Sequence, residues 1–360
     1  MKVAVGMSGG VDSSVAALLL KQEGHEVLGV TMKIWRAGAA PGLQAGNTCY
    51  GPEEESEVEE ARAVCTHLGI VHETIDCAES YERIVLDYFK AEYRAGRTPN
   101  PCIRCNQEIK FGLLPRLVKD RIFTYDKFAT GHYARAVFDA AAGRYRLWKG
   151  VEPRKDQSYF LYRLSQEQLA TVMFPLGLLR KDEVRRLARE AGIAVHDKPE
   201  SQDFCSGDYA AIMAGEPGAG EGDIIDSSGT VLGRHRGIWR YTIGQRKGLG
   251  IAWTEPLYVL GIDAANNRLI VGTGKEIARR AFIVQNCTWS GSEVLREPVE
   301  VKVKIRSTSP ETDARVEPGA NNEVRVTFSA PQPSITPGQS AVFYDGDCVL
   351  GGGIIDRILT

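Results

Sequence analysis

The stretch Val5-Gly-Met-Ser-Gly-Gly-Val-Asp-Ser13 decides the fold of the first part of the chain. The short apolar run that leads into it, Val3 to Val5, predicts a buried parallel strand. The glycines predict a tight turn, and the apolar residues from Val15 to Leu20 predict a helix that ends near Gly24. Such a strand, turn and helix N-terminus form an anion site, because backbone N–H groups and the positive end of the helix dipole face a phosphate placed there.

This loop is not a Walker A loop, because no Gly-Lys-Ser/Thr sequence ends it. It resembles the Ser-Gly-Gly-x-Asp-Ser loop of the ATP pyrophosphatases, also called PP-loop enzymes. That resemblance implies cleavage of ATP between the α and β phosphates and adenylation of a carbonyl oxygen. An ordinary Gly-rich turn between a strand and a helix is the alternative interpretation of the loop.

Length and composition set mild limits on function. The 360 residues exceed one typical domain, so two or three domains are expected. The net charge of −2 means that any RNA-binding surface must come from local clusters. No signal peptide and no apolar stretch of about 18 residues is visible, so we expect a cytoplasmic protein without a membrane partner. In that compartment the eight cysteines are expected to be reduced, catalytic or metal-bound.

Strands and helices alternate in the first part of the chain. Strands are expected at 27–35, 70–75 and 128–133, and helices at 53–68 and 80–95. This order predicts an α/β fold with a doubly wound parallel sheet. The resemblance of the loop implies that the sheet is of the PP-loop or adenine nucleotide α-hydrolase-like type. The ligand of such a sheet binds beyond the carboxyl ends of the strands.

β-Rich patterns replace this alternation after about residue 205. Turns at 226–229 and 263–267 predict hairpins, and further strands are expected at 299–305, 323–328, 340–344 and 348–355. We therefore predict three domains: a PP-loop catalytic domain at 1–204, a small β-rich central domain at 205–278 and a C-terminal antiparallel β-barrel at 279–360.

Four cysteines lie in helix-like or strand-like surroundings and are expected to be small buried side chains: Cys65, Cys77, Cys287 and Cys348. Cys49 lies in a predicted loop and has no assigned role. Cys205 lies in a polar, loop-like segment, where it is either a functional thiol or a packing residue.

Cys102 and Cys105 lie ahead of a helix that is expected to start near Gln107. A cysteine before a helix and beside Arg104 and Lys110 is expected to have a lowered thiol pKa, which suits a nucleophile or a metal ligand. A single CxxC leaves that choice open, since structural zinc sites usually have four ligands.

A series of motifs runs in order over nearly the whole chain: Gly6–Ser13, Gly29–Lys33, Gly96–Pro101, Cys105–Phe111, Ala129–Tyr133, Lys155–Leu161, Glu200–Asp203 with Cys205, Thr242–Gly250, Pro337–Tyr344 and Gly351–Gly353. This series resembles the bacterial tRNA-specific 2-thiouridylases, a family of tRNA-uridine 2-sulfurtransferases.

The resemblance implies roles for particular residues. ATP would be bound by Gly6, Met7, Ser8, Gly9, Gly10, Val11, Asp12, Ser13, Met32 and Gly131. Cys205 would carry sulfur as a persulfide, and Cys105 would be its nucleophilic partner, with a transient disulfide between them. Asn100, Pro101 and Cys102 would lie by the target base, and tRNA would be contacted by His132, Lys155, Asp156, Gln157, Arg306, Ser307 and Gln339.

The implied reaction explains these residue types. The oxygen on carbon 2 of uracil is a poor leaving group, and adenylation by ATP with Mg²⁺ turns it into AMP, which leaves readily. A persulfide sulfur then attacks carbon 2, and a second cysteine releases the sulfur from its carrier. The expected partners are tRNA, with the wobble uridine of its anticodon splayed out of the stack, and a sulfur-relay protein. The enzyme itself is expected to be a monomer.

Two positions depart from the family pattern. Cys102 stands where many members carry Asp, so a [4Fe–4S] cluster on Cys102, Cys105 and Cys205 is an alternative, with one iron open to sulfide. In that alternative Cys205 is a cluster ligand and carries no persulfide. Ser307 follows Arg306 where an aromatic residue is usual, which weakens the case for this RNA contact.

Local charge favours RNA binding in the central region. Residues 234–247 contain five cations and no acid, and Trp239 and Tyr241 lie among them. Cations interleaved with aromatic rings suit backbone and base contacts, and a solvated hairpin face is the alternative. Two other functions are alternatives. Another PP-loop ligase or amidating synthetase would have no use for Cys105 and Cys205. A non-enzymatic iron–sulfur or RNA-binding protein would not need the intact Gly-rich loop.

Overall fold

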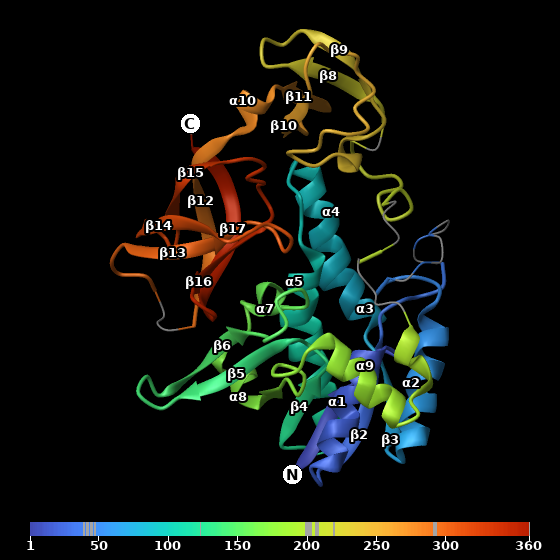
Figure 1. Cartoon of the computed structure of the whole chain (residues 1–360). Helices are drawn as coiled ribbons and strands as arrows, with labels where there is room; N and C mark the ends of the chain where they lie inside the picture. Colours follow the sequence, from blue (N-terminus) through green and yellow to red (C-terminus); the bar gives the residue numbers. More distant parts are fainter. Residues whose placement is uncertain are drawn as a thin grey trace. The chain divides into compact units, whose positions relative to one another are not determined.

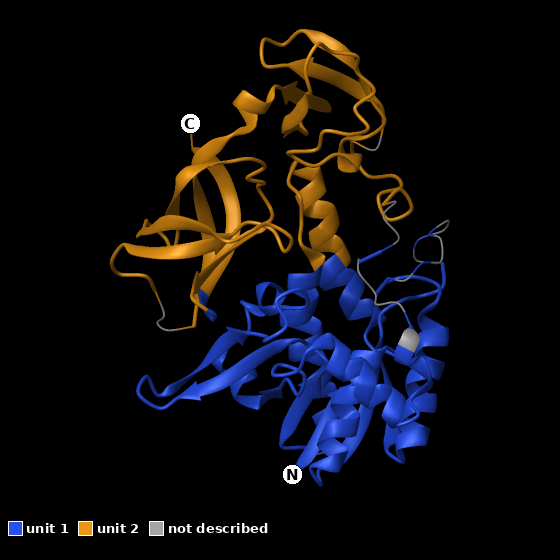
Figure 2. Ribbon diagram, viewed as in Figure 1, with its two compact units in different colours: residues 1–85, 102–207, 347–350 blue, residues 86–101, 208–346, 351–360 orange. Residues whose placement is uncertain are grey.

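The fold is described from a computed structural model of the chain (Figure 1). The structure describes residues 1–38, 40, 43, 46, 48–122, 124–198, 204–205, 209–218, 220–290 and 294–359. The chain divides into two compact units (Figure 2). Unit 1 comprises residues 1–85, 102–207 and 347–350, and unit 2 comprises residues 86–101, 208–346 and 351–360.

A five-stranded parallel sheet forms the centre of unit 1. Its strand order is β3-β2-β1-β4-β7, and every pairing is parallel. The strands are β1 (Lys2–Gly6), β2 (Glu26–Lys33), β3 (Val71–Asp76), β4 (Lys127–Thr130) and β7 (Val172–Met173). The order runs outward from β1 to β3 and resumes on the other side of β1 with β4. The carboxyl ends of β1 and β4 therefore meet at the switch point, where ligands of such sheets bind.

Helices α1 (Val11–Gln22), α2 (Glu54–Leu68) and α9 (Lys181–Glu190) contribute to the core beside this sheet (Figure 1). Helix α1 is apolar on most sides, and Val15, Ala16 and Ala17 are fully buried, as expected for a helix packed between a sheet and other helices. Helix α2 ends at Gly69, which has the left-handed conformation that favours glycine. The predicted parallel-sheet fold is confirmed.

The helix expected near Gln107 begins earlier, at Pro101. Residues Pro101–Cys105 form α5, which continues through a π-helical stretch (Asn106–Leu113) into α6 (Leu114–Arg121). Proline suits the first position of a helix, because its missing N–H would have no helical partner there and its φ is already helical. Cys102 and Cys105 therefore lie inside a helical segment, and the prediction that they precede it is wrong.

Other elements of the first 200 residues follow or extend the prediction. The helix expected at 80–95 consists of α3 (Ala78–Tyr81), a π-helical turn (Glu82–Leu86) and α4 (Asp87–Arg94). An antiparallel hairpin that the sequence did not predict follows β4, made of β5 (Ala134–Asp139) and β6 (Arg144–Lys149). The short elements after it are α7 (Ser158–Leu161), α8 (Gln166–Thr171) and a 3₁₀ turn (Ala194–Asp197).

Unit 2 contains a four-stranded sheet in the order β10-β11-β8-β9. Both predicted hairpin turns are confirmed: they join β8 (Gly222–Asp226) to β9 (Val231–His235), and β10 (Tyr258–Asp263) to β11 (Arg268–Gly272). A 3₁₀ turn (Ile238–Arg240) and helix α10 (Gly274–Ile277) complete this region.

A six-stranded antiparallel barrel follows, in the order β12-β15-β14-β13-β16-β17, with β12 also paired to β17. Its strands are β12 (Arg279–Trp289), β13 (Val299–Lys304), β14 (Thr312–Pro318), β15 (Val324–Gln332), β16 (Ser340–Asp345) and β17 (Cys348–Leu359). Pairing of the first and last strands removes the open edges of the sheet. The predicted barrel is confirmed, although β14 was not predicted.

The four cysteines expected to be packing residues are buried, with exposed fractions between 0% for Cys65 and 6% for Cys287. No helix in the described part of the chain is long and apolar enough to cross a membrane.

Candidate functional site

The ends of β1, β2 and β4 border a cavity of about 270 Å³ in unit 1, which we call the loop cavity. Nine of the ten residues predicted to bind ATP line it: Gly6, Met7, Ser8, Gly10, Val11, Asp12, Ser13, Met32 and Gly131. The tenth, Gly9, has φ of +69°, and a Cβ there would lie 2.7 Å from the carbonyl oxygen of Glu57. Only glycine allows the loop to approach α2 this closely.

Hydroxyl groups hold the loop in shape. The Ser13 Oγ accepts a hydrogen bond from the Ser8 N–H at 3.2 Å and donates one to the Gly10 carbonyl at 3.1 Å. The Ser14 Oγ donates to the same carbonyl at 2.8 Å. The N-terminal turn of α1 is thereby placed at the cavity, where its N–H groups and helix dipole favour an anion.

Gly131 brings β4 against the start of α1. A Cβ at this position would lie 2.6 Å from the carbonyl carbon of Asp12 and 2.7 Å from the Ser13 nitrogen. Any larger residue would therefore displace main-chain atoms of the loop.

The Asp12 carboxylate is bound by two residues that sequence reasoning did not assign to the site. Lys181 Nζ lies 2.7 Å from Asp12 Oδ1 and 2.9 Å from Oδ2, and the Tyr133 hydroxyl donates to Oδ1 at 2.9 Å. The Lys181 side chain is only 12% exposed. Asp12 and Lys181 are 169 positions apart, so no local pattern could have paired them. Lys181 adds a fixed positive charge beside the Gly-rich loop.

His132 and Gln157, which were predicted to contact tRNA, line the same cavity. His132 is 9% exposed, and its Nδ1 lies 2.8 Å from the Thr130 hydroxyl. Burial, assisted by Lys110, holds the pKa of His132 well below its ordinary value, so the imidazole is neutral at physiological pH. The Gln157 side-chain oxygen accepts the Tyr133 N–H at 3.0 Å.

The neighbours of Gln157 have different roles. Asp156 accepts hydrogen bonds from the N–H groups of Gly150 and Ser158, both at 3.1 Å, and from the Ser158 hydroxyl at 2.8 Å. It therefore shapes the loop that leads into α7. Lys155 is half-buried beside it.

One wall of the loop cavity is acidic and was not predicted. Glu54 accepts hydrogen bonds from the N–H groups of Ile34 and Trp35, and burial raises the pKa of Glu54. Burial also raises the pKa of Glu57 to about 7, although Lys198 opposes the rise. Lys110 and Lys198 line the cavity as well, so this wall carries charges of both signs.

The proposed sulfur-transfer cysteines also lie in unit 1. Burial raises the pKa of the Cys105 thiol to about 11, with Lys110 acting in the opposite direction. The predicted lowering of its pKa is therefore wrong, because removal from water disfavours the thiolate more than the nearby cation favours it. Cys102 is half-buried and Cys205 is 1% exposed. The motif residues Glu200–Asp203 before Cys205 lie outside the described residues.

In unit 2, Gln339 supports the segment that leads to the predicted target-base residues. Its Nε2 donates to the carbonyls of Thr98 at 3.1 Å and Pro99 at 3.0 Å. These carbonyls directly precede Asn100 and Pro101, so Gln339 positions the segment through its main chain.

Arg306 also forms a hydrogen bond to a main-chain carbonyl. Its Nη2 donates to the Ile243 carbonyl at 2.7 Å and to the Thr336 hydroxyl at 2.6 Å. Ser307 beside it is half-buried. These bonds tie the barrel to the loop at Ile243, a structural task that the sequence did not indicate.

The basic stretch at 234–247 differs from its prediction. Trp239 and Tyr241 are each 6% exposed, and the Arg240 guanidinium lies 4.3 Å from the centre of the Trp239 ring. The interleaved aromatic residues pack inward because their apolar area stabilises this small region, so they are not displayed for base stacking. The cations themselves are exposed: Arg234, Arg236, Arg240, Arg246 and Lys247.

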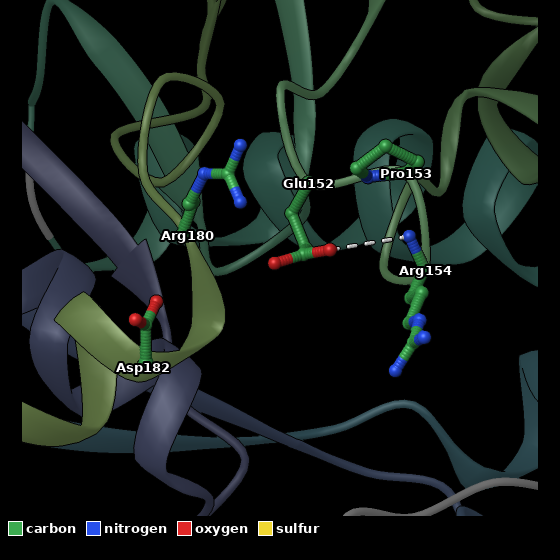
Figure 3. A pocket seen from close by; sticks show the side chains of 5 residues that line it. All are labelled: Glu152, Pro153, Arg154, Arg180 and Asp182. Carbon is green, nitrogen blue, oxygen red and sulfur yellow. Dashed lines mark hydrogen bonds between the residues drawn. The ribbon is translucent and has the colours of Figure 1, made fainter.

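A second cavity of about 490 Å³ lies near the start of α9 (Figure 3). Its wall contains Glu152, Pro153, Arg154, Arg180 and Asp182, and the Glu152 carboxylate accepts the Arg154 N–H at 3.3 Å. Two acids and two arginines balance each other here, so the lining does not select one sign of ligand charge.

The described residues contain no group of three or more His, Cys, Asp or Glu side chains placed to hold a metal ion. Cys102, Cys105 and Cys205, all of which are described, therefore do not form a ready-made cluster site in this structure.

A parallel sheet with this Gly-rich loop at its switch point defines an adenine-nucleotide-binding enzyme of the PP-loop class. Three family models match consecutive parts of the chain: "tRNA methyl transferase HUP domain" at residues 1–206, "tRNA methyl transferase PRC-barrel domain" at 212–273 and "Aminomethyltransferase beta-barrel domain" at 279–355.

Full-length relatives narrow the assignment. The tRNA-specific 2-thiouridylase of Endomicrobium trichonymphae is 45% identical over 358 residues, which cover 99% of each chain. The tRNA-specific 2-thiouridylase of Geobacter metallireducens is 46% identical over 366 residues, which cover 100% of this chain and 98% of the relative. That of Geotalea uraniireducens is 47% identical over 364 residues, which cover 99% of this chain and 95% of the relative. The chain belongs to the tRNA-specific 2-thiouridylase family. Membership implies use of ATP and of tRNA as substrate.

Proposed function

We propose that this protein catalyses ATP-dependent 2-thiolation of the wobble uridine in tRNA anticodons. The observation that supports this best is the loop cavity, where nine of the ten expected ATP-binding residues come together in a chain of the 2-thiouridylase family. The Mg²⁺ that accompanies ATP would be held by its phosphates with Asp12 or Glu57, since Mg²⁺ usually takes one or two carboxylates beside phosphate oxygens.

In the first step the uracil O2 attacks the α-phosphorus of ATP, and the bond between the α-phosphorus and the bridging oxygen breaks to release pyrophosphate. The N-terminus of α1 and the Lys110 ammonium, both at the loop cavity, stabilise negative charge on the phosphates. The imidazole of His132 is neutral, so it orients substrate groups in the loop cavity by hydrogen bonding and adds no charge there. The product is a uridine whose C2 carries an AMP leaving group.

In the second step the terminal sulfur of a Cys205 persulfide attacks C2, and AMP leaves. The Cys105 thiolate then attacks the Cys205 sulfur, so that a Cys105–Cys205 disulfide forms while the terminal sulfur stays on C2. Because the pKa of Cys105 is about 11 before tRNA binds, the thiol must lose its proton within the complex, and Lys110 favours the thiolate. A dithiol reductant supplies the two electrons that afterwards return both cysteines to thiols.

The [4Fe–4S] cluster on Cys102, Cys105 and Cys205 is the alternative sulfur-handling arrangement. We further propose delivery of sulfur by a relay protein, a monomeric enzyme in the cytoplasm, and the three-domain division at residues 1–204, 205–278 and 279–360.

Nucleoside mass spectrometry tests the proposal. The protein is treated with a sulfane-sulfur donor, which can place a persulfide on a cysteine, and is then incubated anaerobically with tRNA, ATP and Mg²⁺; in a parallel sample inorganic sulfide replaces that donor. Wild type, Cys105→Ala, Cys205→Ala and protein after iron removal are compared. We expect 2-thiouridine that requires ATP and both cysteines but not iron, and a control substitution in the barrel, Cys348→Ala, should retain activity. Dependence on iron would favour the cluster. Cleavage of ATP to AMP with no thiolated nucleoside would contradict the sulfur assignment.

A further inference from the structure

Cys49 received no role from the sequence, yet it lies beside the reaction chemistry. Of the described residues that line the loop cavity, it is the one cysteine, and its side chain is exposed. Cys205, by contrast, is 1% exposed, and Cys105 is half-buried with a pKa raised by burial. All three belong to unit 1.

Contacts through Tyr50 join the Cys49 segment to the Cys205 segment. The Tyr50 N–H donates to the Phe204 carbonyl at 3.0 Å, and the two rings stack with centroids 5.8 Å apart and planes 16° apart. Cys49 directly precedes Tyr50, and Cys205 directly follows Phe204. The two thiols are therefore carried by hydrogen-bonded neighbouring segments.

Tyr81 belongs to the same aromatic cluster. Its ring stacks on Tyr50 with centroids 5.5 Å apart and planes 15° apart. Burial raises the pKa of Tyr81, and the thiols of Cys105, Cys102 and Cys49 add to that rise, as Cys49 does for Cys105. The electrostatic effect of one charged group on the pKa of another weakens with the distance between them. Cys205 in turn adds to the raised pKa of Tyr50. All four thiols therefore lie near enough to this pair of stacked tyrosines to influence a tyrosine pKa.

The proposed reaction leaves a disulfide between Cys105 and Cys205, and the burial of Cys205 shields that bond from a reductant in solution. Thiol–disulfide exchange requires access to a sulfur, so a thiol within the protein can open a bond that an outside thiol cannot reach.

We propose that Cys49 is the resolving thiol that reopens the Cys105–Cys205 disulfide after each sulfur transfer. The Cys49 thiolate attacks the Cys105 sulfur, a Cys49–Cys105 bond forms, and the Cys105–Cys205 bond breaks. Cys205 leaves as a thiolate and takes up the proton that Cys49 gave up, so this exchange involves no net oxidation. A dithiol in solution then reduces the exposed Cys49–Cys105 disulfide and is itself oxidised, and Cys205 is ready to accept sulfur again.

This inference rests on the persulfide route proposed above, and the test separates the two. Persulfide-loaded wild type and Cys49→Ser are given MgATP and tRNA, first without reductant for one turnover and then with a dithiol and fresh sulfur donor for repeated turnovers. Thr48→Ala is the matched control, because it alters the same segment but keeps the thiol. The Thr48 hydroxyl donates to the carbonyls of Gly46 and Tyr50 within this segment.

We expect Cys49→Ser to complete the first turnover like wild type and to slow later turnovers on the order of tenfold, with the Cys105–Cys205 disulfide accumulating in peptide mass spectra. Equal later turnover of Cys49→Ser and wild type would overturn the resolving role and leave the persulfide route standing. An equal loss already in the first turnover would also overturn it. Absence of the Cys105–Cys205 disulfide in Cys49→Ser after one turnover would overturn both proposals.

Discussion

Around the loop cavity, burial decides which single side chains are charged at neutral pH. Burial raises the pKa of Glu57 from 4.5 to about 7, so the folded protein holds this proton more tightly than the unfolded chain. The resulting stabilisation is complete below pH 4.5 and is lost as the pH rises through about 7. We expect Glu57→Gln to be more stable than wild type above pH 7, with the difference closing towards pH 4.5.

Urea unfolding of both proteins between pH 4 and 8 measures this difference. Glu55→Gln is the matched control on the same helix, because a hydrogen bond from Lys33 lowers the pKa of the exposed Glu55 and gives the opposite sign. A Glu57→Gln difference that does not change with pH would contradict the prediction.

Cys105 provides a second prediction at the residue scale. With a pKa of about 11, it is a neutral thiol at pH 7, and iodoacetamide should label it about tenfold faster for each unit of pH rise between 7 and 9. Lys110→Met should slow labelling, because Lys110 lowers this pKa. Peptide mass spectrometry of timed samples gives the rates, with Lys119→Met on α6 as control. A labelling rate that already levels off below pH 9 would rule out the high pKa.

At the scale of elements, β4 and α1 meet so closely that one methyl group disturbs their junction. In Gly131→Ala the new Cβ would lie 2.6 Å from the Asp12 main chain, so the loop must shift. We expect ATP affinity to fall by about tenfold or more, from overpacking of 1–3 kcal/mol, while the protein stays folded. Isothermal titration with ATP measures the loss. Gly51→Ala, whose nearest neighbour is 3.6 Å away, should bind ATP normally, and unchanged affinity of Gly131→Ala would refute the prediction.

Element boundaries also show where local patterns mislead. The helix predicted from Gln107 starts at Pro101, because proline can begin a helix as well as interrupt one. The hairpin of β5 and β6 was missed because its strands show no regular alternation: in β6, Leu147 is buried among half-buried neighbours. The pairing of β6 with the first residues of β17, about 200 positions away, is a contact that a local pattern does not contain.

At the scale of the whole molecule, a net charge of −2 means that tRNA affinity must come from local cations. Replacing Arg236, Arg246 and Lys247 by Gln removes three exposed charges of the central region. We expect weaker tRNA binding and a slope of log affinity against log salt that is smaller by about 2, since each lost phosphate contact removes about 0.7–0.9. ATP binding should not change.

Filter binding of tRNA at 50–200 mM salt measures this slope. The matched control replaces Lys275, Lys302 and Arg315, three exposed cations elsewhere in unit 2, and has the same change in net charge. An equal effect of both triple variants would show that total charge, and not this cluster, determines tRNA affinity.

The parallel sheet, the Gly-rich loop and the barrel could all be predicted from the sequence, because strand periodicity, glycine turns and helix starts are properties of neighbouring residues. The sequence also placed Gly6 to Ser13 with Met32 and Gly131 in one site, through motifs whose order marks the family. Only the tertiary structure decided the partners of Asp12, the inward packing of Trp239 and the direction of the Cys105 pKa. These depend on contacts between residues distant in the chain and on the removal of water around them, neither of which is a local property of the sequence.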